Sequence, residues 1–401
     1  MNPVLAFTVV MLVWTISDYV AKKTQSLLSS LFVASIIFLI GFLTGLFPHD
    51  LLTASSLLAL AGVVVGFIIV HLGTMISLDD FKKQWKTFLI GISTVIGIGI
   101  ALWVASLIFG GPISGAAQEG YARARDFVIA GTGALSGGTI SVVLVQDAAL
   151  GVGLTSVAIF PVLIAALQGL VGFPLTSIIL KREAARLKGE YRAGNLAPVE
   201  VTEQEAAVES KLPAGLRTTA GTLFVVGLAV LLSIGINNLT NGVLNTFVVA
   251  LILGITLRTL GVFKPSVLGG IDSLGLMMIA IMILIFGPLA TIQPSDVAEL
   301  ARPLLIAFVF GVLGIGLFSA AVGKVLGYSV PMSVAIGLTS LYGFPGTMIL
   351  SQEAARGAGE TPEEVAAIEH EILPKMIVAG FATVTITSVI VTSILVAHIG
   401  G

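Results

Sequence analysis

The chain has 401 residues, of which 56% are hydrophobic and only 10% are charged, and its mean hydropathy is +1.07. Soluble domains carry charge on about a quarter of their residues, so this composition excludes a soluble globular protein and indicates a polytopic membrane protein. The net charge of -2 excludes a basic surface for nucleic acid, and the absence of cysteine excludes disulfides and thiolate chemistry.

Apolar stretches of spanning length predict ten transmembrane helices. They cover residues 4–21, 27–47, 54–76, 87–110 and 154–180, and then 217–236, 242–260, 269–291, 303–325 and 373–397. The first stretch follows no basic segment, and Lys22 and Lys23 come after it. We therefore expect an uncleaved first span whose start lies outside the cell.

Two further apolar segments are interrupted by glycine and hydroxyl residues, at 127–149 and, 206 residues later, within 331–355. They align without a gap: Leu135, Gly137, Leu144, Gln146, Asp147, Ala148 and Ala149 pair with Leu341, Gly343, Leu350, Gln352, Glu353, Ala354 and Ala355. A weaker match pairs Phe32 with Phe247. Broken apolar segments at equivalent places in a repeat are typical of the binding site of a secondary transporter.

The distribution of basic residues indicates that both broken segments enter and leave the membrane on the same face. With that topology and the N-terminus outside, seventeen Lys and Arg residues lie in cytoplasmic loops and three lie outside, as the positive-inside rule requires. If both segments crossed the membrane, the basic linker at 181–216 would fall outside. We therefore predict a multi-pass protein of the cell inner (plasma) membrane, with both termini outside and the linker in the cytoplasm.

The predicted fold is an all-α polytopic membrane protein with two inverted repeats of five transmembrane helices, each carrying a re-entrant glycine-tipped hairpin. The first repeat covers 1–180 with its hairpin at 127–149, and the second covers 217–401 with its hairpin at 331–355. The linker 181–216 lies between them, and its start at 181–192 predicts a helical extension. Five spans are an odd number, so the hairpins enter from opposite faces and their tips meet near the middle. Non-helical backbone at that depth must be buried in protein or line a cavity, as in an alternating-access site.

The two tips combine small hydroxyl side chains, accessible backbone and half-helix ends. Glycine lets the backbone approach a ligand, helix N-termini attract carboxylates, and carbonyls at helix C-termini suit Na⁺. A glycine-rich kink that lets helices pack closely is the structural alternative. The predicted substrate-binding residues are Ser136, Gly137, Gly138, Thr139, Tyr342, Gly343, Pro345, Gly346, Thr347, Lys375 and Thr383. The predicted Na⁺ ligands are Ser136, Ser141, Thr347, Gln146 and Gln352.

Several ionisable residues have two interpretations each. Asp147 and Glu353 lie about ten residues past the tips, roughly 15 Å by helical rise, so each is either a cation ligand or an interfacial cap. His71 relays protons or, as we favour, bonds to a neighbouring helix. Lys375 holds a substrate carboxylate or extends to the cytoplasmic interface. Pro374 stands where a zinc-binding HExxH motif would need its second histidine, which excludes that motif.

The order of the spans, the LSGG first tip, the span GLTSVAIFPVLIAALQGLVGFPL that follows it and the YGFPGT second tip resemble the sodium:glutamate symporters. More distantly, they are similar to the 2-hydroxycarboxylate (citrate/malate) carriers. The resemblance covers almost the whole chain in architecture and is concentrated at the broken segments. It implies two re-entrant loops, a homodimer and elevator-type transport driven by Na⁺. Ser136, Gly137 and Gly138 match the first tip, and the second tip matches in position only.

The leading hypothesis is a Na⁺-coupled symporter of a small organic anion such as glutamate or a di- or hydroxycarboxylate, and not an enzyme. In this hypothesis the part that carries the hairpins moves against a dimeric scaffold made of the first spans of each half. The alternative is a cation/proton antiporter. Antiporters usually need a buried acid pair in mid-membrane, and no Asp or Glu lies at the centre of a predicted span. The substrate and the ion stoichiometry stay open.

Overall fold

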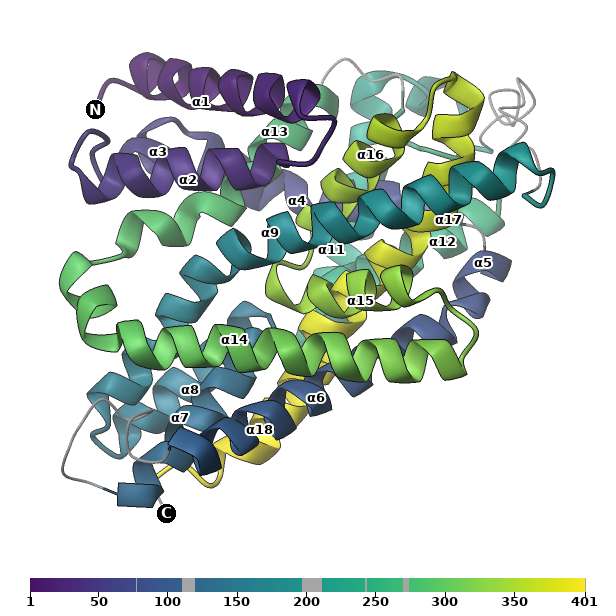
Figure 1. Cartoon of the computed structure of the whole chain (residues 1–401). Helices are drawn as coiled ribbons and strands as arrows, with labels where there is room; N and C mark the ends of the chain where they lie inside the picture. Colours follow the sequence, from purple (N-terminus) through teal and green to yellow (C-terminus); the bar gives the residue numbers. More distant parts are fainter. Residues whose placement is uncertain (77, 110–119, 197–210, 242–243, 270–273, 401) are drawn as a thin grey trace.

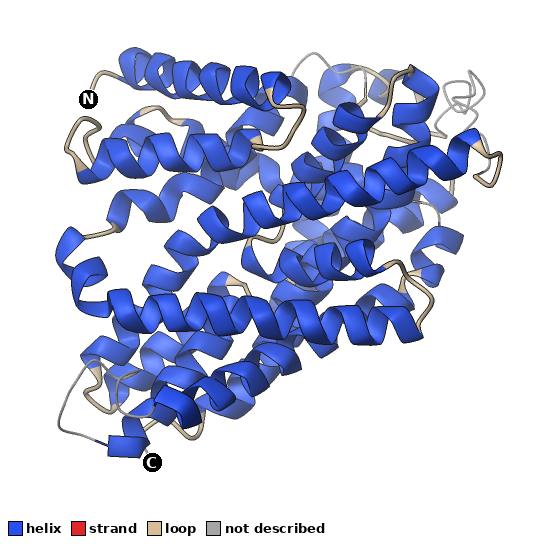
Figure 2. Cartoon of the chain, in the orientation of Figure 1, coloured by secondary structure: helices blue, strands red, loops and turns tan. Residues whose placement is uncertain are grey.

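A computed structural model describes residues 1–76, 78–109, 120–196, 211–241, 244–269 and 274–400 (Figure 1). In these ranges the regular structure is helical throughout, with no strand (Figure 2). Seven of the described helices are long and apolar enough to cross a membrane. The predicted class of a multi-pass, all-α membrane protein agrees with this architecture.

The first half contains α1 (Pro3–Lys23), α2 (Ser30–Leu43), α3 (Leu51–Ala54), α4 (Leu57–Met75), α5 (Leu78–Lys83), α6 (Trp85–Phe109), α7 (Gly120–Leu135), α8 (Thr139–Gly151) and α9 (Thr155–Arg192). A short helix η2 (Ala214–Leu216) precedes the second half. The second half contains α11 (Thr219–Leu239), α12 (Thr246–Thr259), α13 (Leu274–Phe286), η3 (Gly287–Thr291), α14 (Pro294–Val325), α15 (Val330–Leu338), η4 (Thr339–Leu341), α16 (Gly346–Ala358), α17 (Pro362–Phe381), the π-helix η5 (Ala382–Thr387) and α18 (Ser388–Val396).

Two of the ten predicted spans are shorter than expected. The stretches 27–47 and 242–260 form α2 and α12, which have 14 residues each. A helix of that length rises about 21 Å, which is less than the roughly 30 Å of a bilayer core. Both helices end just before a glycine in the left-handed conformation, Gly45 (φ +72) and Gly261 (φ +76), which is a common helix stop. Hydropathy extends past these stops because the following loops are also apolar.

The helices form two bundles that we name by their content. The scaffold bundle contains the first helices of each half, α1 to α4 and α11 to α13, with α4 packed against α12 and α13. The broken-helix bundle contains α6 to α9 and α14 to α18, with α6 and α14 as its most extensive helix pair. Helices from both halves of the chain therefore contribute to each bundle.

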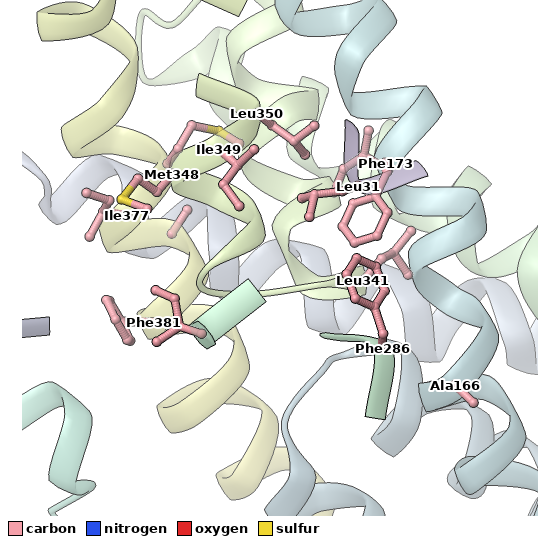
Figure 3. Packing of buried hydrophobic residues seen from close by; sticks show 14 of the residues in the cluster. Leu31, Ala166, Phe173, Phe286, Leu341, Met348, Ile349, Leu350, Ile377 and Phe381 are labelled. Atoms are coloured by element: carbon pink, nitrogen blue, oxygen red, sulfur yellow. The ribbon is translucent and has the colours of Figure 1, made fainter. Parts of the chain in front are cut away.

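The boundary between the bundles is largely apolar. Figure 3 shows Leu31 of α2 and Phe286 of α13 close to Phe173 of α9 and Leu341 of η4. All four side chains are fully buried. Apolar contact has no directional requirement, so these four side chains make no directed bond across the boundary.

Inside the broken-helix bundle, α6 and α14 cross at two glycines. A Cβ atom added to Gly314 would lie 2.3 Å from the carbonyl oxygen of Gly97, and one added to Gly97 would lie 2.7 Å from the carbonyl oxygen of Gly314. Small residues let membrane helices approach to backbone contact, which is the main source of packing energy where lipid surrounds them. The crossing therefore fixes α6 and α14 against each other.

This crossing generates a stability prediction. Gly314→Ala should destabilise the protein by about 1–3 kcal/mol, because the new methyl group forces two backbones apart. Gly316→Ala, two residues along the same helix, is the matched control, since nothing lies within 4 Å of its added Cβ. Thermal unfolding of the purified protein in detergent measures both. Equal melting temperatures for the two variants would contradict the close crossing.

Candidate functional site

The first broken segment is interrupted where the sequence predicts. The helix α7 ends at Leu135 and α8 starts at Thr139, with Gly137 (φ +82) and Gly138 (φ +90) between them. Only glycine adopts such backbone angles without strain. A Cβ atom added to Gly133 would lie 2.8 Å from the Val145 side chain, so α8 folds back along α7.

The second broken segment is interrupted at the equivalent place. The helix η4 ends at Leu341, the repeat partner of Leu135, and α16 starts at Gly346. Gly343 has a φ of +58 in the connection. The two helix breaks therefore fall at equivalent positions of the sequence repeat.

The two breaks meet on the last membrane helix. An added Cβ on Gly137 would lie 2.5 Å from the carbonyl oxygen of Ser340 and 2.7 Å from the Val384 side chain. One on Gly138 would lie 2.3 Å from the Val384 carbonyl oxygen, and one on Gly343 would lie 3.3 Å from the Val384 side chain. Val384 lies in the π-helix η5. Such distortions are frequent at functional sites.

Ser388 forms hydrogen bonds to several residues of the first break. Its hydroxyl donates to the carbonyl oxygen of Gly137 at 2.5 Å and shares hydrogen bonds with the hydroxyls of Ser136 (2.9 Å) and Ser141 (2.5 Å). All three serines are fully buried. Four oxygen atoms, two from the break itself and one each from α8 and α18, are thus gathered at one point.

The second break is surrounded by hydroxyls that have no partner. The side-chain oxygens of Ser340, Thr347 and Thr383 are buried and make no hydrogen bond. Thr347 lies against Gly380, and Thr383 lies against Gly91 of α6. Buried hydroxyls are normally bonded, so such a group of unpartnered donors is a candidate ligand-binding feature.

The half-helices that leave the two breaks start without a side-chain cap. The N-cap positions are Gly138 for α8 and Pro345 for α16, and neither provides an acceptor. Uncapped helix N-termini present N–H groups and the positive end of the helix dipole, which suit an anion. Thr139 and the next residue of α8 are exposed, whereas the first six residues of α16 are buried.

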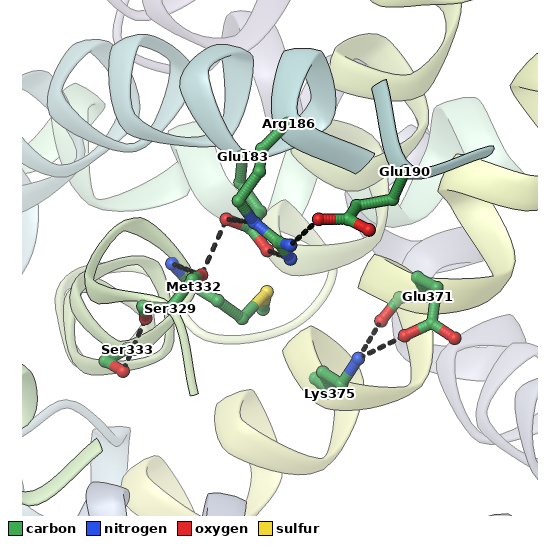
Figure 4. Close-up of polar contacts among 8 residues, drawn as sticks. All are labelled: Glu183, Arg186, Glu190, Ser329, Met332, Ser333, Glu371 and Lys375. Atoms are coloured by element: carbon green, nitrogen blue, oxygen red, sulfur yellow. Dashed lines mark hydrogen bonds and ion pairs between the residues drawn. The ribbon is translucent and has the colours of Figure 1, made fainter. Parts of the chain in front are cut away.

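Two predicted substrate-binding residues make local contacts instead. The hydroxyl of Tyr342 donates to Thr176 of α9 at 3.1 Å, and its ring packs on Phe173. Lys375 bonds to the carboxylate of Glu371 at 2.7 Å (Figure 4). Its Nζ also lies 5.9 Å from the ring centroid of Tyr328. The structure therefore does not bring Lys375 into contact with the tips.

The residues predicted as Na⁺ ligands do not all lie together, and their role as ligands stays a prediction. Ser136 and Ser141 meet at Ser388, and Thr347 lies at the other break. The amide of Gln352 donates to Glu369 at 3.2 Å. Gln146 lines a cavity of about 160 Å³ with Thr291 and Asp296, between α8, α9 and the start of α14. The glutamines lie too far along their helices because helical rise moves them away from the tips.

The other ionisable candidates also have defined surroundings. Glu353 accepts the N–H of Ser30, the first residue of α2, at 3.1 Å, so it acts as a helix cap from another element. Its repeat partner Asp147 is exposed. His71 is buried, and its Nδ1 accepts the N–H of Leu268 at 3.2 Å. Of the two interpretations of His71, this contact corresponds to the hydrogen bond to a neighbouring element, and its partner is the backbone of a loop, not of a helix.

The helical extension predicted at 181–192 is confirmed, because α9 continues to Arg192. At its start the carboxylate of Glu183 accepts hydrogen bonds from Arg186 (2.7 Å) and from Ser329 (2.6 Å), the N-cap of α15 (Figure 4). The extension therefore contacts the N-terminal end of the second broken segment.

The end of the same extension holds the exit of that segment. Glu360 pairs with Lys188 (2.5 Å) and Arg192 (2.8 Å), and Glu364 pairs with Arg192 (2.7 Å). Hydrogen bonds from Lys188 and Arg192 lower the pKa of Glu360 to about 2, and Arg192 lowers the pKa of Glu364. A carboxyl group whose pKa is lower in the folded than in the unfolded chain stabilises the fold at pH values above its unfolded pKa. This stabilisation is lost as the pH falls through the folded pKa. All three ion pairs are therefore intact at neutral pH.

Sequence reasoning missed Ser340, Val384 and Ser388. The last span carries hydroxyls at several positions, but nothing in the sequence selects Ser388 from Thr383, Thr385 and Thr387. The side chain of Thr385 lies outside the described residues.

Compared with known proteins, the chain matches no protein-family model and no curated protein sequence.

The cluster around Ser388 generates a second stability prediction. Ser388→Ala should cost about 1–2 kcal/mol, because it leaves the Gly137 carbonyl and two serine hydroxyls with fewer partners. Thr392→Val, one turn further along α18, is the control, because the Thr392 hydroxyl is buried without a hydrogen bond. It should change stability by less than about 0.5 kcal/mol. Thermal unfolding in detergent compares the two, and a harmless Ser388→Ala would contradict the assigned role.

Proposed function

We propose that this protein is a Na⁺-coupled secondary transporter of a small organic anion, such as glutamate or a di- or hydroxycarboxylate, that works by an elevator-type mechanism. The observation that carries the proposal is the meeting of two broken helices, equivalent in the sequence repeat, on one distorted helix. Broken helices of this kind place half-helix ends and free backbone groups around a ligand within the membrane.

The oxygen cluster at the first break supports a site for the coupling ion Na⁺. The Gly137 carbonyl and the hydroxyls of Ser136, Ser141 and Ser388 are close enough to share one small cation. The carbonyl follows the C-terminal end of α7, where the helix dipole is negative. Without the ion these oxygens bond to one another, and with it the hydroxyls turn their lone pairs toward the cation.

The second break supports a site for the carboxylate. Ser340, Thr347 and Thr383 provide unpartnered hydroxyl donors, and α16 starts there with an uncapped N-terminus. Lys375 is already paired with Glu371, so in this proposal donors and the helix dipole, and not a lysine, balance the substrate charge. Hydroxyl donors recognise carboxylates of several sizes, which leaves the substrate class broader than glutamate.

The arrangement of the bundles supports movement of the broken-helix bundle against the scaffold. Both chain ends lie at the left of Figure 1, and the C-terminal end of α9 lies at the right, so the connection to the second half starts opposite the termini. The outer faces of α1 and α11 expose large apolar side chains, among them Leu12, Phe224 and Leu231. Such faces suit lipid and the dimer contact that the family resemblance implies.

Substitution of a tip glycine tests the proposal. Gly137→Ala should abolish Na⁺-driven uptake into proteoliposomes, because the methyl group would collide with the Ser340 carbonyl of the opposite break and would force a strained φ angle. Gly151→Ala, at the end of α8, should keep uptake, since nothing lies within 4 Å of its added Cβ. Radiolabelled glutamate, malate and citrate are the substrates to screen. Normal uptake by Gly137→Ala would contradict the tip assignment.

Binding of the coupling ion has a separate readout. Na⁺ should raise the melting temperature of the purified protein relative to K⁺ at equal ionic strength, because a ligand that binds the folded state stabilises it. A Ser136→Ala, Ser141→Ala variant should lose most of this difference. Cation exchange against protons without any organic substrate would favour the antiporter and contradict the symporter.

A further inference from the structure

Glu353 connects the two bundles with directed hydrogen bonds. The backbone N–H of Ser30 and its hydroxyl both donate to Oε1 of Glu353, the former at 3.1 Å. The hydroxyl of Ser26 donates to the carbonyl oxygen of Glu353 at 3.0 Å. Ser26 lies in the α1–α2 connection and Ser30 is the first residue of α2, both in the scaffold bundle, whereas Glu353 lies on α16 of the broken-helix bundle. Because hydrogen bonds are directional, this contact resists sliding where the neighbouring boundary is apolar.

The same contact leaves part of the carboxylate unused. The second oxygen of Glu353, Oε2, is buried without a hydrogen bond. With Ser177 and Lys181 of α9, Glu353 lines a cavity of about 10 Å³. Among the described residues, the carboxyl group of Glu353 is therefore hydrogen-bonded to Ser30 alone. Release of Ser30 breaks no other hydrogen bond of this side chain.

The described residues of a second connection in the scaffold make matching contacts. Residues 24–29 join α1 to α2, and residues 240–245 join α11 to α12. In each, a threonine hydroxyl donates to the carbonyl four residues earlier and accepts the N–H four residues later, namely Thr24 with Val20 and Leu28, and Thr240 with Ile236 and Leu244. The next residues, Gln25 and Asn241, both have a φ of +50. The matching conformation shows that the two connections are equivalent parts of the repeat.

The equivalence extends to the residues that make the contact. Thr246 is the first residue of α12, as Ser30 is of α2, and it offers the same backbone N–H and a hydroxyl. Asp147 is the repeat partner of Glu353 on α8. Within the described part of the chain, Asp147 makes no hydrogen bond or ion pair, and the N–H of Thr246 meets no acceptor.

The topology places Asp147 and Thr246 on one side of the protein. The helix α8 ends where α9 starts, α9 crosses to the opposite side, and α11 starts after the linker and crosses back. The end of α11 and the start of α12 therefore lie on the side where α8 ends. By the same reasoning, Glu353 and Ser30 lie on the other side.

We propose that Glu353 and Asp147 are alternating latches of the transport cycle. Glu353 on Ser30 closes one side and holds the state seen here, and Asp147 takes the corresponding place on Thr246 when the broken-helix bundle has moved to the other side. The exposed start of α8 and the buried start of α16 agree with a state that is closed at the Glu353 side. This inference rests on the proposed alternating-access function.

The chain contains no cysteine, so engineered cysteine pairs report the two states without background. A Ser30→Cys, Glu353→Cys pair reports the state seen here, and an Asp147→Cys, Thr246→Cys pair reports the other. In membrane vesicles treated with copper phenanthroline, we expect each pair to form an intramolecular disulfide. Adding Glu353→Ala to the Asp147→Cys, Thr246→Cys pair should raise its cross-linking rate roughly tenfold or more, because the variant loses both hydrogen bonds from Ser30, which together are worth at least about that population shift.

Glu299→Ala in the same background is the control, since Glu299 is exposed on α14, and it should leave the rate unchanged. Glu353→Gln keeps an acceptor oxygen and should give an intermediate rate, which separates loss of the latch from misfolding. No disulfide between positions 147 and 246 in any background, or the same rate with Glu299→Ala as with Glu353→Ala, would overturn the proposal.

Uptake by the protein without substitutions distinguishes failure of the latch proposal from failure of the proposed function. Uptake without the 147–246 disulfide contradicts the latches and leaves the transporter standing. Alternating disulfides without uptake of any tested anion contradict the proposed substrate class and leave the latches standing.

Discussion

The close approach of backbone at the two breaks is the constraint on which the rest of the structure depends. Gly137 and Gly138 touch the carbonyl oxygens of Ser340 and Val384, which no residue with a side chain can do without moving its neighbours. Helices that stop inside a bilayer leave polar backbone groups that lipid cannot satisfy. In this protein they stop against one another and against the π-helix of the last span, where Ser388 accommodates one of the free carbonyls.

The kinds of contact differ between the inside of the broken-helix bundle and its boundary. Inside, the α9 extension holds both ends of the second broken segment, through Glu183 with Ser329 and through Lys188 and Arg192 with Glu360. At the boundary with the scaffold, apolar side chains such as Leu31 and Phe173 meet, and Glu353 adds directed bonds at one edge. Hydrogen bonds and ion pairs fix the helices of the broken-helix bundle relative to one another, whereas apolar contact permits displacement. This division supports a rigid unit that moves against a scaffold.

The repeat gives the two broken segments equivalent residues but different surroundings. The start of α8 is exposed and that of α16 is buried, and Asp147 is free of the contact that its partner Glu353 makes. Two nearly equivalent units in unequal environments are what one state of an alternating-access carrier requires. In the proposed mechanism, the second state exchanges the two environments and needs no new type of contact.

The sequence by itself determined the class of the protein, the approximate helices and the positions of both breaks. These features are local, because hydropathy reports burial in lipid and glycine runs report where a helix stops. The gapless pairing of Leu135 with Leu341 also predicted that the breaks are equivalent. Only the tertiary structure decided that Ser388 and Val384 receive the tips, that Gln146 and Gln352 lie apart from them, and that Lys375 is paired with Glu371. Those contacts depend on how helices distant in sequence cross. A hydroxyl or amide residue in an apolar stretch does not indicate, from the sequence, which residue it will contact.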